Sequence, residues 1–249
     1  MMINANNLFK DYKPHILNLD LQAEKKYILD DHLIVNRENN ISIYYSAHNE
    51  VINTQASIII IGICPGFQQM YKSFSIVKSL ENSNDDDILE NCKSESRLFG
   101  SSRQNLITMF DQLNINYFLK VNKASEIFDL KFKKLHTTSL IRYPVFIGKE
   151  LKNYNGYTPS LLKNSFLYRI ASNSIQYEIE QLPNLKIIIP LGKAVETFLD
   201  EIFRLNTTIN RKIIRGFPHP SGLNAHRKKI FDSNKANIIN QIKLLYDNQ

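Results

Sequence analysis

Two short segments of the chain place residues that can do chemistry at sharp turns. Cys64 lies in the first segment, Gly62-Ile-Cys-Pro-Gly-Phe67, and His219 begins the second, His219-Pro-Ser-Gly-Leu-Asn224. A histidine can donate a hydrogen bond or exchange a proton near neutral pH. A cysteine activated by a histidine can be a nucleophile for acyl transfer, although we identify no third residue that would orient the histidine.

Each turn follows a run of residues with strand character. Ser57-Ile-Ile-Ile-Ile61 precedes the first turn, and Ile213-Ile-Arg-Gly-Phe217 precedes the second. In an open α/β sheet, ligands bind outside the carboxyl ends of the strands. We therefore expect the two turns to form the two walls of one cleft.

The rest of the chain alternates strand and helix patterns. We expect further strands at Ile41–Tyr45, Leu135–Ile141 and Lys186–Leu191, and a loop at Asn82–Asp87. We expect four helices. The first has Ser101 or Ser102 as its cap and one apolar face with Leu106, Met109, Phe110 and Leu113, and the second spans Ser160–Leu182. The apolar face of the third carries Val195, Phe198, Leu199, Ile202 and Phe203, and the last, capped by Ser233, buries Ile238, Ile239, Ile242, Leu245 and Tyr246. This alternation predicts an α/β fold, a three-layer α/β/α sandwich with a mostly parallel central sheet. We expect residues 1–50 to form a flanking segment and residues 51–249 to form a single domain.

Composition and charge exclude several classes of protein. The 249 residues include two cysteines, too few for a disulfide scaffold or for a four-cysteine zinc or iron–sulfur site. The amino terminus lacks the pattern of a secretory signal, and no apolar stretch reaches the roughly 20 residues that span a bilayer. We therefore expect a cytoplasmic protein with no membrane, metal or cofactor requirement.

The charge of the chain favours an anionic partner. The formal net charge is +7, and from Ile209 to Ile230 there are six Lys or Arg residues and no Asp or Glu. Such local bias around a candidate site is typical of proteins that contact phosphates, although a run of charges can also be a solvated helix face.

The two turns together resemble motifs of the uracil-DNA glycosylase superfamily, most closely its single-strand-selective and mismatch-specific branches. The resemblance rests on Gly-x-x-Pro-Gly after a strand and on His-Pro-Ser-x-x-Asn in a late loop. Leu98–Leu106 is similar to the segment that supplies a stacking aromatic ring, here Phe99. Thr137–Ile141 is similar to the strand whose tip reads the base, here with Ser139. The likeness spans roughly Ser57 to Leu245.

The resemblance implies a monomeric enzyme that flips a deaminated base, uracil, out of single-stranded or mismatched DNA and hydrolyses its glycosidic bond without a cofactor. His219 and Cys64 take the catalytic positions. The residues implied in binding the flipped base are Gly62, Ile63, Pro65, Gly66, Phe67, Phe99 and Ser139. The residues implied in binding DNA are Ser221, Gly222, Leu223, Asn224, Arg227 and Lys228, with Leu223 as the wedge in the base stack.

Three positions depart from the family pattern. Cys64 stands where the best-studied branches have Asp or Asn, and a thiol holds a water molecule poorly. Gly66 stands where the classical uracil-specific branch has a Tyr that rejects thymine, and Ser139 replaces a bidentate Asn. A second reading is therefore a catalytically weak or silent nucleic-acid-binding protein of the same fold. The structural alternatives are a surface turn for His219, a small buried residue for Cys64 and a core position for Phe99.

Overall fold

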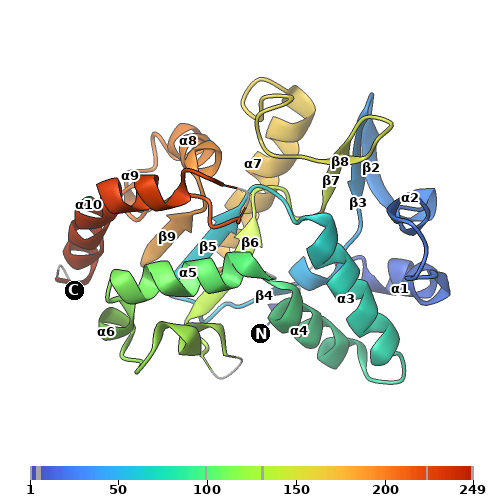
Figure 1. The fold of residues 1–249 in the computed structure, drawn as a ribbon, viewed down its shortest axis with the longest axis horizontal. Helices are drawn as coiled ribbons and strands as arrows, with labels where there is room; N and C mark the ends of the chain where they lie inside the picture. Colours follow the sequence, from blue (N-terminus) through green and yellow to red (C-terminus); the bar gives the residue numbers. More distant parts are fainter. Residues whose placement is uncertain (1, 4–6, 99, 130–131, 223, 248–249) are drawn as a thin grey trace. The chain divides into compact units, whose positions relative to one another are not determined.

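A computed structural model describes residues 2–3, 7–98, 100–129, 132–222 and 224–247 (Figure 1). The chain forms two compact units, each assembled from three separate stretches. Unit 1 comprises residues 1–52, 64–97 and 141–175, and unit 2 comprises residues 53–63, 98–140 and 176–249. The predicted α/β class is confirmed, because strands and helices make up both units.

Unit 2 contains a three-stranded parallel sheet with the order β6-β5-β9. The strands are β5 (Ile58–Gly62), β6 (Leu135–Ser139) and β9 (Ile187–Pro190). The central strand carries four consecutive buried isoleucines, and strands covered on both faces have such unbroken apolar runs. The parallel register sets Gly62 opposite Ser139, so both strands end at the same edge of the sheet.

Helical elements cover the sheet of unit 2. One face packs in a single core with residues of α5 (Ser101–Gln112), α6 (Ile115–Leu119), the 3-10 helix η3 (Ala124–Phe128) and α10 (Arg227–Asp247). On another part of β6, His136 and Thr138 hydrogen-bond Glu178 of α7 (Ser165–Glu180) at 2.9 Å each. Because side chains alternate along a strand, Ile58 and Ile60 face α5 while His136 and Thr138 face α7. These contacts are consistent with the expected three-layer sandwich.

Two short helices complete unit 2 after β9. They are α8 (Lys193–Ile202) and α9 (Thr207–Asn210). The predicted apolar face of α8 is confirmed, since Val195, Phe198 and Leu199 are buried. So is the buried face of α10, where Ile238 and Ile242 are inaccessible to solvent.

Unit 1 contains antiparallel strands. Its larger sheet has the order β2 (Ile34–Glu38), β3 (Ile41–Tyr44), β7 (Val145–Ile147) and β8 (Lys152–Asn153), and β1 (Met2–Ile3) pairs with β4 (Val51–Ile52). Its helices are α1 (Phe9–Asn18), α2 (Lys25–Ile28), α3 (Phe67–Ser79) and α4 (Asp85–Ser96), with the 3-10 helices η1 (Asp31–Leu33) and η2 (Ala47–Asn49). The antiparallel sheet was not part of the sequence prediction. The division into a flanking segment, residues 1–50, and one domain, residues 51–249, stays a prediction.

A buried polar cluster joins separate stretches of unit 1. Glu50 is fully buried and receives hydrogen bonds from the Arg142 guanidinium and from the Tyr143 hydroxyl, the latter at 2.6 Å. Asn49 accepts a bond from the buried Lys93 ammonium at 3.0 Å. Buried charges need such partners, because an isolated one costs several kcal/mol.

Three local predictions are wrong. Ile213–Phe217 is not a strand, because its pairing in the sheet is a single bridge between Ile188 and Ile213. Helix α5 has Gly100 as its N-cap without a side-chain bond, so neither Ser101 nor Ser102 caps it. Ser233 lies inside α10, where its hydroxyl donates back to the Lys229 carbonyl at 2.9 Å.

The acidic segment Asn82–Asp87 is also more ordered than predicted. Asn84 caps α4 by accepting the Asp87 N–H at 2.9 Å, and Asp85, Asp86 and Asp87 form the first helical turn. Carboxylates there interact favourably with the helix dipole, so the run of aspartates is a helix start.

Candidate functional site

The carboxyl edge of the parallel sheet brings the start of the first turn next to Ser139. A Cβ atom built on Gly62 would lie 3.4 Å from the Ser139 hydroxyl oxygen. The Leu140 N–H donates to the Gly62 carbonyl at 2.8 Å, and the Leu191 N–H donates to the Ile61 carbonyl at 2.9 Å. All three strands therefore end within one hydrogen-bonded edge of unit 2.

His219 lies at this same edge, against the turn from β9 to α8. Gly192 adopts a φ of +95°, and a Cβ atom there would lie 3.1 Å from the Cβ of His219. The Gly192 N–H also donates to the Phe217 carbonyl at 3.1 Å. A glycine is required at this position, since it accepts the positive φ and leaves room for the histidine.

The hydrogen bonds of His219 define its tautomer. Its Nδ1 accepts the Ser221 N–H at 3.2 Å, so the neutral ring carries its proton on Nε2. The residue reaches the surface, but the protein atoms around it partly desolvate the ring and lower its pKa below the ordinary value. At neutral pH His219 is therefore an uncharged imidazole with Nε2–H as its donor.

Side chains from α5 and α10 hold the turn that carries His219. The Asn105 amide donates to the Pro220 carbonyl at 2.8 Å, and the Arg227 guanidinium donates to the Ser221 carbonyl at 2.6 Å. Asn224 closes the turn with a bond from its amide to the His219 carbonyl at 3.1 Å. Of the predicted DNA-binding residues, Asn224 and Arg227 thus shape the turn itself.

Gly222 and Lys228 complete the described part of this predicted surface. Gly222 is exposed, and a Cβ atom on it would lie 3.2 Å from the Ser101 hydroxyl oxygen. Lys228 is exposed in the first turn of α10. Two predicted residues, the stacking Phe99 and the wedge Leu223, lie outside the described residues.

Cys64 has the properties of a protonated, inert thiol. Its Sγ contacts the Tyr154 carbonyl at 3.6 Å, within unit 1, and burial raises its pKa to about 12. The thiolate is the nucleophilic form, so this environment opposes acyl transfer by Cys64.

The remaining residues of the first turn begin helix α3. The Gly66 N–H donates to Gln69 Oε1 at 3.2 Å, and the Phe67 N–H donates to Asn153 Oδ1 at 3.4 Å. The N–H groups of Gly66 and Phe67, two residues implied in binding the base, therefore have partners within unit 1. Pro65 is buried beside them, and Ile63, which belongs to unit 2, is 8% exposed.

The ring of Phe67 belongs to an aromatic group in unit 1. Its centroid lies 6.5 Å from that of Phe146, and the Lys25 ammonium lies 5.3 Å from the Phe67 ring and 4.7 Å from the Phe146 ring. Burial of the Lys25 ammonium lowers its pKa below the ordinary value.

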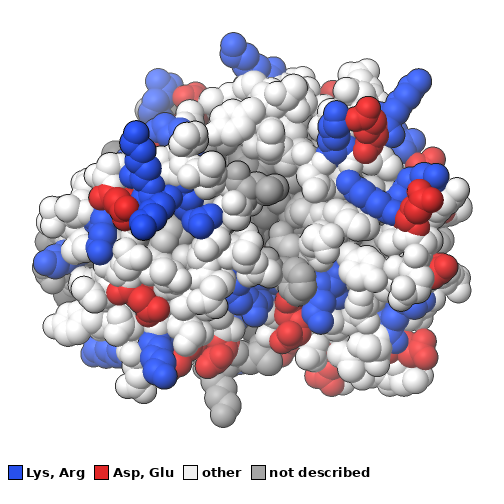
Figure 2. All heavy atoms as spheres, viewed as in Figure 1, with Lys and Arg blue, Asp and Glu red and all other residues white. Residues whose placement is uncertain are grey.

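The cations of residues 209–230 fall into two groups. Arg211, Lys228 and Lys229 are exposed, and Lys and Arg side chains stand out over the region of α9 and α10 in Figure 2. Arg215 differs, because its guanidinium donates to Asp200 at 2.6 Å and to the Asn210 side chain at 2.8 Å. The Arg215 guanidinium therefore already has protein partners on α8 and α9.

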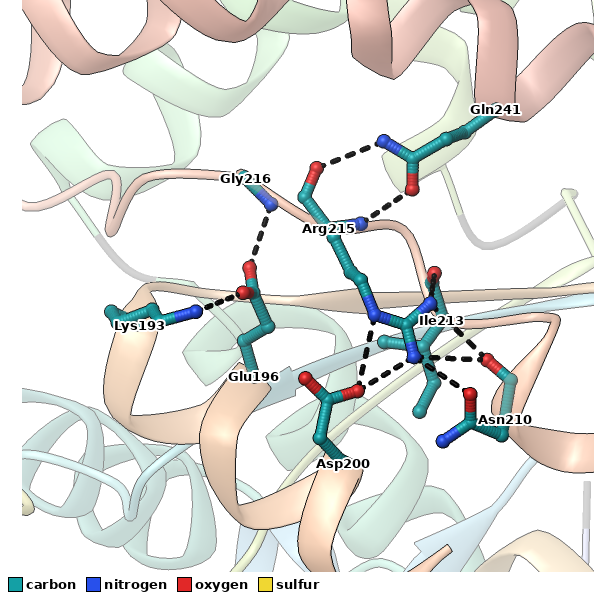
Figure 3. A network of polar contacts seen from close by, with 8 residues as sticks. All are labelled: Lys193, Glu196, Asp200, Asn210, Ile213, Arg215, Gly216 and Gln241. Atoms are coloured by element: carbon teal, nitrogen blue, oxygen red, sulfur yellow. Dashed lines mark hydrogen bonds and ion pairs between the residues drawn. The ribbon is translucent and has the colours of Figure 1, made fainter. Parts of the chain in front are cut away.

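Sequence reasoning missed the side chains that hold the segment before His219. Glu196, Asn234 and Gln241 hydrogen-bond the backbone of residues 215–216, as Figure 3 shows for Glu196 and Gln241. Their positions in the sequence carry no motif, since each looks like an ordinary polar residue on an amphipathic helix.

No group of three His, Cys, Asp or Glu side chains that could hold a metal ion occurs in the described ranges. Nor does any helix there have the length and apolar character needed to cross a membrane.

Comparison with known proteins identifies a close relative. The chain is 36% identical over 245 residues to the uncharacterized protein YoxB of Bacillus subtilis (strain 168), covering 98% of this chain and 94% of YoxB. The chain belongs to the YoxB family. No protein-family model matches this chain. Among solved structures, SMUG2 of Pedobacter heparinus matches it with a TM-score of 0.46 and 16% identity, covering 78% of this chain and 77% of that one, a likeness on which we base no argument.

Proposed function

We propose that this chain is a DNA glycosylase-like hydrolase that flips a deaminated base, uracil, out of single-stranded or mismatched DNA and cleaves its N-glycosidic bond. In this proposal the fold is a three-layer α/β/α sandwich of the uracil-DNA glycosylase superfamily, and the protein acts as a monomer. The observation that carries the proposal is the position of His219 at the carboxyl edge of the sheet, where Gly62 and Ser139 also lie. Its neutral imidazole accepts the Ser221 N–H at Nδ1 and keeps its own proton on Nε2.

The chemistry needs a hydrogen-bond donor aimed at the departing base. Water adds to C1′ of the sugar and releases a proton to solvent, the C1′–N1 bond breaks, and its electron pair leaves with the base as an anion. A neutral Nε2–H of His219 can donate to the developing oxyanion of the base, which then takes a proton from solvent. The products are the free base and an abasic site with a hydroxyl at C1′.

Two other groups have defined roles in the proposal. The Ser139 hydroxyl sits at the tip of β6 beside Gly62, where it can donate to or accept from the edge of the base. The exposed Arg211, Lys228 and Lys229 would neutralise backbone phosphates.

A silent nucleic-acid-binding protein is the second candidate, and Cys64 favours it. Its partly buried thiol has a raised pKa, contacts a backbone carbonyl and cannot replace a carboxylate that positions water. We therefore expect that an enzyme with Cys64 at this position would be slow.

The test is a cleavage assay under single-turnover conditions. Excess protein is incubated with labelled single-stranded and mismatched oligonucleotides that carry one uracil, hypoxanthine or xanthine, and alkali then breaks abasic sites. We expect strand breaks at uracil, a loss of roughly 100-fold or more in rate for His219→Ala, and DNA affinity close to that of the wild type. His226→Ala is the matched control, because His226 is exposed and lies seven residues further along the chain.

The outcomes separate the two candidates. Breaks that persist in His219→Ala would remove this residue from the mechanism. Salt-sensitive DNA binding without breaks on any substrate would establish the silent binder instead.

A further inference from the structure

The two residues that lead into the His219 turn have all their backbone hydrogen-bonding groups paired with side chains. The Arg215 N–H donates to Gln241 Oε1 at 2.8 Å, and the Arg215 carbonyl accepts from Gln241 Nε2 at 3.1 Å. The Gly216 N–H donates to Glu196 Oε2 at 2.6 Å, and its carbonyl accepts from Asn234 Nδ2 at 3.1 Å. We call these three side chains, Glu196, Asn234 and Gln241, the backbone clamp; Figure 3 shows the bonds of Glu196 and Gln241.

The clamp replaces the sheet as the support of this segment. The Ile214 N–H donates to the Ile188 carbonyl of β9 at 2.9 Å, and the backbone then leaves the sheet. The Arg215 side chain ties the segment to α8 and α9 by its bonds to Asp200 and Asn210. Backbone groups that leave a sheet must find other partners, and here α8 and α10 supply them.

Gly216 fits the clamp closely. Its φ is +88°, and a Cβ atom would lie 3.0 Å from Cγ of Asn234. The next residues offer little freedom, because Phe217 is buried and His219 stands between Pro218 and Pro220, whose rings fix φ. A displacement of Gly216 would therefore pass to His219.

Glu196 connects the clamp to the turn that touches His219. Its own N–H donates to the Gly192 carbonyl at 3.2 Å, and Gly192 lies against His219. The Glu196 side chain is 6% exposed, and its second oxygen accepts from Lys193 at 2.5 Å. The first turn of α8 thus holds the approach to His219 at two points, one through Gly192 and one through the Glu196 carboxylate.

We propose that the Glu196 carboxylate is a positioning residue for His219, which it aims by holding the Gly216 N–H. The inference rests on the proposed function for its kinetic consequence. Glu196 touches no substrate and acts through the backbone that carries the histidine. A charge-assisted bond to a buried carboxylate is among the stronger hydrogen bonds available for this purpose.

The test compares Glu196→Ala, Glu196→Gln and Glu201→Ala. Glutamine keeps an oxygen that can accept the Gly216 N–H, and Glu201 is an exposed residue of the same helix that supplies the matched control. The single-turnover cleavage rate and the Kd for uracil-containing DNA are measured well below each variant's unfolding temperature. We expect Glu196→Ala to lose roughly 10- to 100-fold in rate with an unchanged Kd, and Glu196→Gln to recover most of the loss.

Two kinetic outcomes would overturn the proposal. One is an unchanged rate in Glu196→Ala. The other is a parallel loss of rate and affinity that glutamine does not rescue, which would make Glu196 a general structural residue.

A wild-type protein that leaves no abasic sites would refute the proposed function, and NMR would then decide the positioning role by itself. Glu196→Ala should shift the imidazole resonances of His219 and the amide resonance of Gly216, while those of His226 stay in place. Unshifted His219 resonances would refute the positioning role.

Discussion

At the scale of single residues, His48 makes the fold sensitive to acid. It is 2% exposed, its Nδ1 lies 2.9 Å from the Ser46 hydroxyl, and burial, aided by the Lys93 charge, lowers its pKa to about 3. The unfolded chain has the ordinary pKa of 6.5, so it binds more protons than the folded protein below that pH. The contribution of His48 to the free energy of unfolding is complete above pH 6.5 and declines as the pH falls toward 3.

We expect this residue to remove about 2 kcal/mol from the free energy of unfolding between pH 7 and pH 5. Urea unfolding followed by circular dichroism at both pH values measures the loss. His48→Gln should flatten that dependence, and His226→Gln, a substitution at an exposed histidine, is the matched control. Equal pH dependence in wild type and His48→Gln would contradict the assignment.

The candidate site was readable from the sequence only in part. His219 stood out because its turn is a local pattern of Pro, Ser and Gly residues. Its partners Asn105 and Gly192 did not, because contacts between distant stretches leave no trace in a single sequence. The same holds for Cys64, whose raised pKa depends on burial beside Tyr154 rather than on its neighbours in the chain.

At the scale of elements, local pattern and structure agree where a segment is paired with the sheet core. The run of isoleucines forms β5, and the apolar face with Leu106 and Phe110 forms the core side of α5. Ile213–Phe217 has similar strand character, but after a single bridge to Ile188 its backbone meets the side chains of Glu196 and Gln241. Propensity alone does not distinguish these cases, since tertiary partners decide them.

The first turn of α10 carries a charge pattern that opposes helix stability. Arg227, Lys228 and Lys229 open the helix, and that turn has no acidic residue. Cations at a helix N-terminus interact unfavourably with the dipole, by typically 0.3–1 kcal/mol each. A phosphate partner would offset this cost in the complex.

Lys228→Glu should therefore move stability and DNA binding in opposite directions. We expect a gain of a few tenths of a kcal/mol in the free energy of unfolding, together with weaker binding and a shallower dependence of log K on log salt. Lys243→Glu makes the same charge change on an exposed residue near the other end of α10 and should affect binding less. Equal loss of affinity in both variants would place the DNA contact elsewhere.

At the scale of the whole molecule, the first 50 residues supply buried side chains to unit 1. Phe9, Ile16, Leu33 and Tyr45 are fully inaccessible to solvent, and Glu50 receives bonds from Arg142 and Tyr143. No linker-like composition marks a boundary between the units, and each is discontinuous in the chain. Such an arrangement could not be predicted from composition, which detects only sequential domains.

Deletion of residues 1–50 should abolish cooperative folding of unit 1. Each large buried side chain that is lost costs about 2–5 kcal/mol, and the sum exceeds the 5–15 kcal/mol stability of a typical protein. Thermal unfolding followed by circular dichroism should show a broad transition or none. A truncated protein with the wild-type midpoint would mean that residues 1–50 only flank a self-sufficient domain.

The central position of β5 has a consequence for the synthesis of the protein. The ribosome makes Ile58–Ile61 long before its two neighbours, since β6 begins at Leu135 and β9 at Ile187. At about 5–20 residues per second, the nascent isoleucine run waits on the order of ten seconds for its last partner. Unpaired apolar strands of this kind aggregate readily, so the yield of native protein should depend on translation rate and on chaperones that shield this segment.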